Sequence, residues 1–134
     1  PDIMAGNIIG ILAQRLVRTL KLECKQAYLP SEIECRILGL DFHTNEQQIY
    51  RVGEEFKHAE HQGYEGRLAL MELLKFDAVM DELIARSATQ RELSEAALAN
   101  NFEALADVAV KRVIEGLTTL DEVSRVVDLT EKIT

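Results

Sequence analysis

Apolar residues near the start of the chain recur at helical spacing. Over residues 3–20 they fall on one stripe of a helical projection, which predicts a helix with one buried face. The stripe consists of Met4, Ile8, Ile11, Leu12 and Leu16. The most apolar run, IIGILA at 8–13, is far shorter than the ~20 residues that a membrane span needs. A buried helix opening without a starting methionine leads us to expect a partner domain upstream.

The next forty residues predict short elements separated by loops. KLECKQAYLP at 21–30 is expected to be an irregular connection. Ser31 and Glu34 have the spacing of a capping box, and Gly39 follows the helix that this box would begin. QQIYRV at 47–52 alternates polar and apolar residues, which predicts a short strand.

The stretch LALMELL at 68–74 fits both a helix and a strand by pattern alone. Its residue types favour a helix, whereas its length and the glycines before it favour a strand, which is our prediction. The polar residues of 54–67 are expected to form a loop that leads into it.

From Asp77 onward the pattern predicts a helical tail. Helices are expected over 77–86 and 91–99, the second begun by a Thr89–Glu92 capping box, with a break at Asn100-Asn101. A further helix over 102–115 should stop at Gly116. A Thr119–Glu122 capping box predicts the last one, LDEVSRVV at 120–127.

Together these elements predict an α+β fold that is mostly α. Residues 1–20 would form a terminal helix, 21–66 a small region with short strands, and 67–134 a return strand followed by a helical subdomain. The chain has 134 residues, 47% of them hydrophobic, which is enough for a core. Its net charge of −8 makes nucleic acid an improbable partner. Two cysteines and no secretory pattern indicate a reducing compartment.

Four short sequence features occur in a fixed order along the chain. They are AQRLVRTL at 13–20, then one cysteine, then GYEGR at 63–67 with an apolar ELL at 72–74, then EGLTTLDEVSRVV at 115–127. Each is weak alone, but in this order and at these distances the chain resembles the C-terminal portion of the type II secretion and type IV pilus assembly ATPases. The resemblance covers nearly the whole chain.

The resemblance gives GYEGR a structural role. In that family a G-Y-x-G-R motif follows a small zinc-binding knob held by two C-x-x-C pairs. Gly63 and Gly66 would permit a sharp backbone turn, and Tyr64 and Arg67 would anchor the knob to the body of the protein. A plain turn would use the glycines in the same way, so no catalytic role is assigned to this stretch.

The metal ligands that the resemblance implies are mostly missing. The first C-x-x-C pair would fall at Lys21 and Cys24, and the second at Phe56 and Ala59, so only Cys24 is a cysteine. Structural zinc needs four thiolate or imidazole ligands, so we expect no metal site here. Phe56 and Ala59 would instead fill the region with a small apolar core.

Two histidines and one cysteine offer an alternative metal site. His58 and His61 have a usable ligand spacing, and Cys24 is the thiol that they would join. The simpler interpretation is that both histidines are solvated loop residues beside Lys57 and Glu60.

No catalytic site is predicted in this sequence. None of its seven glycines is followed by lysine, so the phosphate-binding pattern G-x-x-x-x-G-K-[ST] is absent. In the family that loop lies upstream of A-Q-R-L-V-R, together with the magnesium-binding acidic segments. ATP and magnesium are therefore implied for a longer parent protein, and this chain alone is expected not to hydrolyse ATP.

Arg15 and Arg18 are the candidate contact residues. Three positions apart, they would share one face of the predicted helix, where they could reach a neighbouring subunit or the upstream core. An ordinary exposed stripe of arginines is the alternative.

The resemblance implies a part of a homo-hexameric cytoplasmic motor, peripheral to the inner membrane. The motor would act on an inner-membrane platform protein, and this chain would have a structural or coupling role. The pattern does not separate secretion from pilus assembly. A stand-alone helical adaptor and a metal-responsive module using Cys24, His58 and His61 are the rival hypotheses.

Overall fold

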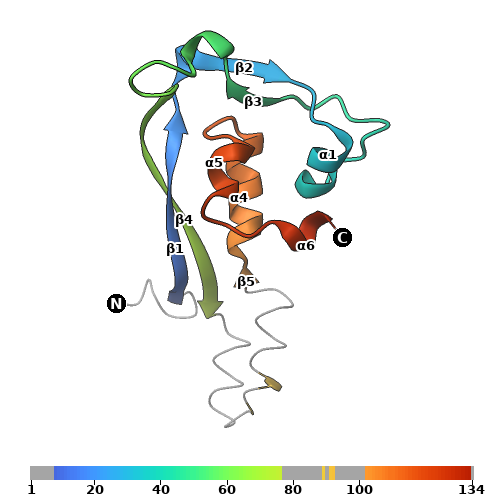
Figure 1. The fold of residues 1–134 in the computed structure, drawn as a ribbon. Helices are drawn as coiled ribbons and strands as arrows, with labels where there is room; N and C mark the ends of the chain where they lie inside the picture. Colours follow the sequence, from blue (N-terminus) through green and yellow to red (C-terminus); the bar gives the residue numbers. More distant parts are fainter. Residues whose placement is uncertain (1–7, 77–88, 90, 93–101, 134) are drawn as a thin grey trace. The chain divides into compact units, whose positions relative to one another are not determined.

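The computed structural model describes residues 8–76, 89, 91–92 and 102–133 (Figure 1). The chain divides into two compact units. The first consists of residues 1–14 and 71–105, and the second of residues 15–70 and 106–134.

Strands form the longest elements of the described residues. Three of them make a sheet in the order β1-β4-β5, and two make a small antiparallel sheet, β2–β3, in which Lys25 pairs with Val52 and Tyr28 with Ile49. The strands are β1 (Ile8–Leu20), β2 (Lys25–Tyr28), β3 (Ile49–Val52), β4 (Tyr64–Phe76) and β5 (Phe102–Glu103).

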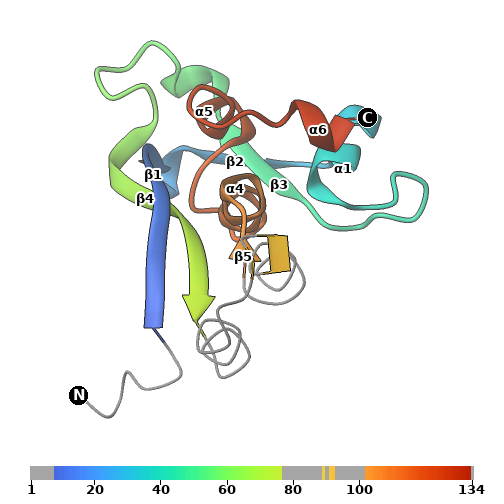
Figure 2. The same cartoon turned by 90° about the horizontal axis from the view of Figure 1, so that it is seen from below.

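Helices and turns connect and cover these strands. The helices are α1 (Glu32–Leu38), α4 (Leu105–Ile114), α5 (Leu120–Ser124) and α6 (Thr130–Ile133), and two 3₁₀ turns are η2 (Leu22–Cys24) and η3 (Glu54–Phe56). Figures 1 and 2 show α4 and α5 beside β2–β3. The glycine that ends α4, Gly116, comes so close to this sheet that a Cβ there would lie 3.0 Å from the Tyr50 ring.

The helix predicted for residues 3–20 is wrong over the part that the structure describes. Residues Ile8–Leu20 form β1 instead, hydrogen-bonded beside β4. Ile11, Leu12 and Leu16, which were assigned to a buried helix face, are 57%, 55% and 50% exposed. A short apolar run does not distinguish a helix from a strand, and here the pairing with a distant strand decides the outcome.

Several local predictions are confirmed. Ser31 and Glu34 form a complete capping box at the start of α1, and Gly39 ends that helix with a φ of 75°. The predicted strands at 47–52 and 68–74 are present as β3 and as part of β4. The segment 21–30, predicted to be irregular, instead contains η2 and β2.

The buried hydrophobic side chains that the structure describes lie in the second unit. Val17 and Leu20 from β1, Ile49 from β3 and Leu70 from β4 are buried at its centre. The chain after residue 105 contributes further buried side chains, which are Val108, Ala109, Val113, Val123, Val127 and Leu129. Both the strands of the predicted knob and the helical tail therefore contribute buried residues to this unit.

In the first unit, β4 contacts β5 and the start of α4. Leu73 and Leu74 of β4 pair with Glu103 and Phe102 of β5, and Glu72 accepts a hydrogen bond of 3.2 Å from the backbone N–H of Leu105. That bond supplies an acceptor for an N–H group in the first turn of α4.

The helical tail is described only in part. Thr89 and Glu92 exchange the two hydrogen bonds of the predicted capping box. The helix predicted over 102–115 is present as α4, although its first two residues pair in β5, and Gly116 follows with a φ of 80°. The helices predicted over 77–86 and 91–99 and the break at Asn100-Asn101 lie outside the described residues, apart from Arg91 and Glu92, which are helical.

The predicted domain boundaries differ from the observed division. Residues 67–134, predicted to be one subdomain, belong to both units, and 15–20 belong with the second unit rather than with a separate terminal helix. The structure combines helices and strands, whereas the predominance of helix stays a prediction because much of the predicted helical tail is not described.

Candidate functional site

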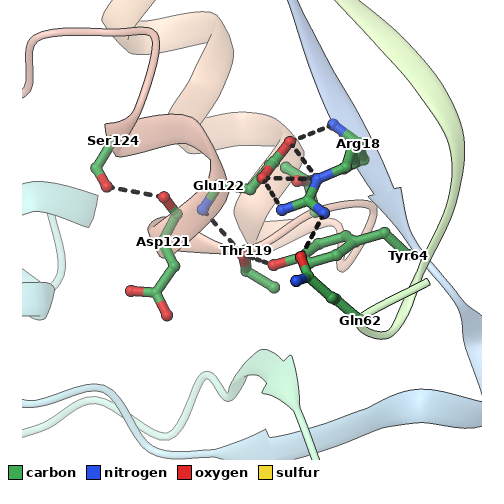
Figure 3. Close-up of polar contacts among 8 residues, drawn as sticks. Arg18, Gln62, Tyr64, Thr119, Asp121, Glu122 and Ser124 are labelled. Atoms are coloured by element: carbon green, nitrogen blue, oxygen red, sulfur yellow. Dashed lines mark hydrogen bonds and ion pairs between the residues drawn. The ribbon is translucent and has the colours of Figure 1, made fainter. Parts of the chain in front are cut away.

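The Arg18 side chain is the centre of a polar cluster in the second unit (Figure 3). Arg18 projects from β1, and its guanidinium meets the Glu122 carboxylate of α5. Nη2 donates to Oε1 at 2.9 Å, and Nε lies 3.2 Å from both carboxylate oxygens. The Arg18 side chain is 31% exposed and that of Glu122 only 8%. A two-pronged bond to a largely buried carboxylate fixes the direction of both side chains.

Two further residues hold the same guanidinium. Nη1 donates to the Gln62 side-chain oxygen at 3.1 Å, and the guanidinium carbon lies 4.3 Å from the centre of the Tyr64 ring. Figure 3 shows Arg18 between the carboxylate on one side and the tyrosine ring on the other. Arg18 thus joins β1 to the loop before β4, to β4 itself and to α5.

Tyr64 forms a second link to α5. Its hydroxyl lies 2.7 Å from the Thr119 hydroxyl, in a buried contact. Thr119 is the N-cap of α5 and accepts a hydrogen bond of 3.1 Å from the Glu122 backbone N–H. This is one half of the predicted capping box. Glu122 does not complete the other half, because its carboxylate binds Arg18 instead of the Thr119 backbone.

The segment from Leu117 to Glu122 also covers one edge of β1. The Leu20 N–H donates to the Leu117 carbonyl at 2.8 Å, as a neighbouring strand would receive it. At Arg18, side chains and not a backbone provide the hydrogen-bond partners of the strand. The Arg18 N–H donates to the Glu122 carboxylate at 2.7 Å, and the Thr118 hydroxyl donates to the Arg18 carbonyl at 2.8 Å.

The electrostatics of the cluster favour the charged forms of both partners. Burial pushes the pKa of Glu122 upward, but hydrogen bonds from the side chain and the backbone of Arg18 outweigh it, and the pKa is lowered. The hydrogen bond to Glu122 raises the pKa of Arg18. Burial raises the pKa of Tyr64, so this residue acts as a neutral hydrogen-bonding group.

The glycines of GYEGR have different surroundings. Gly63 has a φ of 90°, and a Cβ there would lie 2.5 Å from a methyl group of Val52. Gly66 has a φ of 73° and open space around it. Gln62 adopts a left-handed φ of 53°, which is unfavourable for a residue with a side chain. In this conformation its side-chain oxygen accepts the hydrogen bond from Arg18.

The residues singled out in the sequence partly converge in space. A pocket of about 350 Å³ beside the cluster is lined by Arg18, Tyr64, Gly66 and Arg67, together with His61 and two acidic residues. Arg67 is exposed. Arg15 lies exposed on β1, so the expectation that it shares a helix face with Arg18 is wrong because β1 is a strand.

The surroundings of the predicted knob positions differ from one another. Phe56 packs against the cluster of Leu20, Val52 and Tyr64, as expected, whereas Ala59 is exposed and fills no core. Cys24 is buried, and His58 and His61 are exposed. In the described part of the chain, no three side chains of the His, Cys, Asp or Glu type come together as a metal site would require. Whether metal binds stays a prediction.

Comparison with known proteins identifies the family. The sequence profile of the family described as "Type II/IV secretion system protein" matches residues 2–125. The chain belongs to this family. It is 36% identical to the type II secretion system protein E of Pseudomonas aeruginosa over 94% of this chain. It is 33% identical to the type IV pilus assembly ATPase TfpB of Acinetobacter baylyi over 97% of this chain.

The chain spans about a quarter of the length of these relatives, 24% of the first and 22% of the second. It is also 31% identical to the type IV pilus assembly ATPase PilB of Thermus thermophilus, of which it covers 14%. No helix within the described ranges is long and apolar enough to cross a membrane.

The sequence did not reveal that Glu122 binds Arg18, that the Thr119 hydroxyl contacts Tyr64 or that Gln62 belongs to the cluster. The Thr119–Glu122 spacing was visible and predicted a helix start, but it gave no sign that Glu122 would bind a residue 104 positions away. Gln62 precedes the first glycine of GYEGR, and no local signal distinguishes it from an ordinary loop residue.

Proposed function

We propose that this chain is the C-terminal portion of a motor ATPase that powers type II secretion or type IV pilus assembly, and that its own role is mechanical. The relatives named above are a type II secretion protein and two pilus assembly ATPases, which supports this kind of function. The sequence has no phosphate-binding loop, so nucleotide chemistry would belong to another part of the longer protein.

The observation that carries the proposal is the Arg18 cluster. Arg18 belongs to the AQRLVRTL motif, and its guanidinium holds Gln62, Tyr64 and Glu122. A displacement of β1 would therefore be passed to α5 and to the loop before β4 through directed bonds. This arrangement suits a part that transmits or stabilises movement, whereas nothing in the cluster resembles a nucleophile with a general base.

The wider setting follows from the same proposal. The longer protein would be a cytoplasmic homo-hexamer, peripheral to the inner membrane, that uses ATP and magnesium and acts on a membrane platform protein. The exposed apolar side chains Ile11 and Leu12 of β1 are the surface that we assign to the contact with the upstream core. Arg15 and Arg67 are exposed, and we assign them to contacts with neighbouring subunits in this arrangement.

The proposal is tested by complementation in cells that depend on the longer protein. Arg18→Met should abolish secretion or pilus assembly while the protein level and ATP turnover of the longer protein stay near normal. Lys57→Met, which removes only an exposed ion pair with Glu54, is the matched control and should assemble normally. Normal assembly by Arg18→Met would contradict the mechanical role.

A further inference from the structure

Helix α6 joins two parts of the second unit that are far apart in the sequence. It lies beside α1 in both views of the fold (Figures 1 and 2). The Arg36 guanidinium of α1 donates to the Ile133 carbonyl at 3.2 Å. On its other side, the Lys132 ammonium donates to the Asp107 carboxylate of α4. α6 therefore connects α1, which precedes β3 in the chain, to the helical tail.

The attachments of α6 are made at the surface. None of its four residues is buried, and the bonds from Arg36 and Lys132 are both exposed. Exposed ion pairs contribute little to stability, and a helix of one turn is not stable by itself in water. By contrast, the Glu122 carboxylate that binds Arg18 is only 8% exposed. Local opening begins where buried contacts are few, so α6 should detach more readily than this bridge opens.

Buried residues on either side of these attachments define where movement would stop. Val127 and Leu129, which precede α6, are 6% and 7% exposed and hold the chain in place up to the start of the helix. The beginning of α1 is held independently, because the Tyr28 hydroxyl donates to the Glu34 carboxylate at 2.6 Å. Detachment of α6 would therefore free the end of α1 and leave its beginning fixed.

We infer that α6 is a detachable strap that swings away at Leu129, frees the end of α1 and uncovers the Cys35 thiol. Cys35 is 1% exposed and lies one residue before Arg36 on α1. The bridge between Arg18 and Glu122 stays closed during this movement. Such a strap lets α1 change position without breaking the connection from β1 to α5. The inference does not depend on the proposed function, because it concerns an opening of the folded chain itself.

Alkylation of the whole chain by iodoacetamide tests the strap, with the modified cysteine identified by peptide mass spectrometry. When opening and closing are fast, the labelling rate follows the population of the open form. Arg36→Met and Lys132→Met each remove one attachment and should speed labelling of Cys35 about threefold, and the double variant about tenfold. Added salt screens the pair between Lys132 and Asp107, so it should speed labelling of the parent chain more than that of Lys132→Met.

The second cysteine separates strap opening from global unfolding. Cys24 is buried in η2, and its carbonyl accepts a hydrogen bond from the Gly53 N–H, so its labelling rate should stay at the parent value in every variant. Lys57→Met, which removes an exposed ion pair with Glu54, is the matched control and should leave both thiols unchanged. Unchanged labelling of Cys35 in the double variant would overturn the inference. An equal rise at Cys24, or in Lys57→Met, would overturn it as well.

Discussion

At the scale of single residues, the two glycines of GYEGR should respond differently to the same substitution. Both have left-handed φ angles, so alanine is strained at either position. At Gly63 the new methyl group would also collide with Val52. We expect Gly66→Ala to cost about 1 kcal/mol and Gly63→Ala about 2–4 kcal/mol in the free energy of unfolding. Denaturant unfolding of both variants measures the difference, and equal losses would disagree with the Val52 contact.

Substitutions at the end of α4 and at the start of α5 should also lower the free energy of unfolding. Gly116→Val should cost more than ~1 kcal/mol, because the φ is left-handed and Tyr50 leaves little room for a side chain. Thr119→Ala should cost about 1–3 kcal/mol, since it removes the cap of α5 and the partner of the buried Tyr64 hydroxyl. Thermal or denaturant unfolding checks both values. A neutral Gly116→Val would mean that this helix end is wrongly placed.

At the scale of elements, the bridge between β1 and α5 is open to a double-mutant cycle. Arg18→Met and Glu122→Gln, singly and together, should reveal a coupling of about 1–3 kcal/mol in the free energy of unfolding. Additive single losses would show that the bridge contributes nothing to holding the two elements together.

The same bridge predicts a pH dependence. The pKa of Glu122 is lowered in the folded chain, so its stabilisation is complete above the unfolded value of about 4.3 and is lost as the pH falls through the folded pKa. The parent chain should therefore lose its advantage over Glu122→Gln as the pH falls from the unfolded value through the lower folded pKa. Unfolding curves at several pH values follow this difference, and a constant gap between the two proteins would argue against it.

Local patterns predicted elements well where their causes are local. The Ser31–Glu34 box and Gly39 specified α1, because the bonds that begin and end a short helix are made within a few residues. The helix prediction for residues 3–20 was wrong for the opposite reason. The apolar residues of β1 lie on both faces of a strand and happen to match helical spacing, and its partner β4 is distant in sequence.

The candidate site was predictable only in part. Arg18 and Tyr64 were singled out by the motifs, and the structure places them in contact. Glu122 looked like the second half of a capping box, and only the folded chain shows that its carboxylate serves Arg18 instead. A pairing between residues 18 and 122 leaves no periodic trace in the sequence, so pattern analysis could not find it.

At the scale of the whole molecule, the fold should be independent of zinc. Lys21, Phe56 and Ala59 occupy three of the four positions where the family resemblance implies cysteines. Burial raises the pKa of the other thiol, Cys35, which favours its protonated form over a thiolate ligand. We expect less than stoichiometric zinc by elemental mass spectrometry and an unchanged thermal midpoint after chelation. One zinc per chain whose removal unfolds the protein would contradict this.

We assign mechanical work to this chain and nucleotide chemistry to another part of a longer protein. Nucleotide binding by the purified chain tests this division of roles. Titration calorimetry with Mg-ATP should show no saturable binding to the folded chain, and phosphate release should match a heat-inactivated sample. Saturable binding of one ATP per chain, or turnover above that background, would contradict the claim.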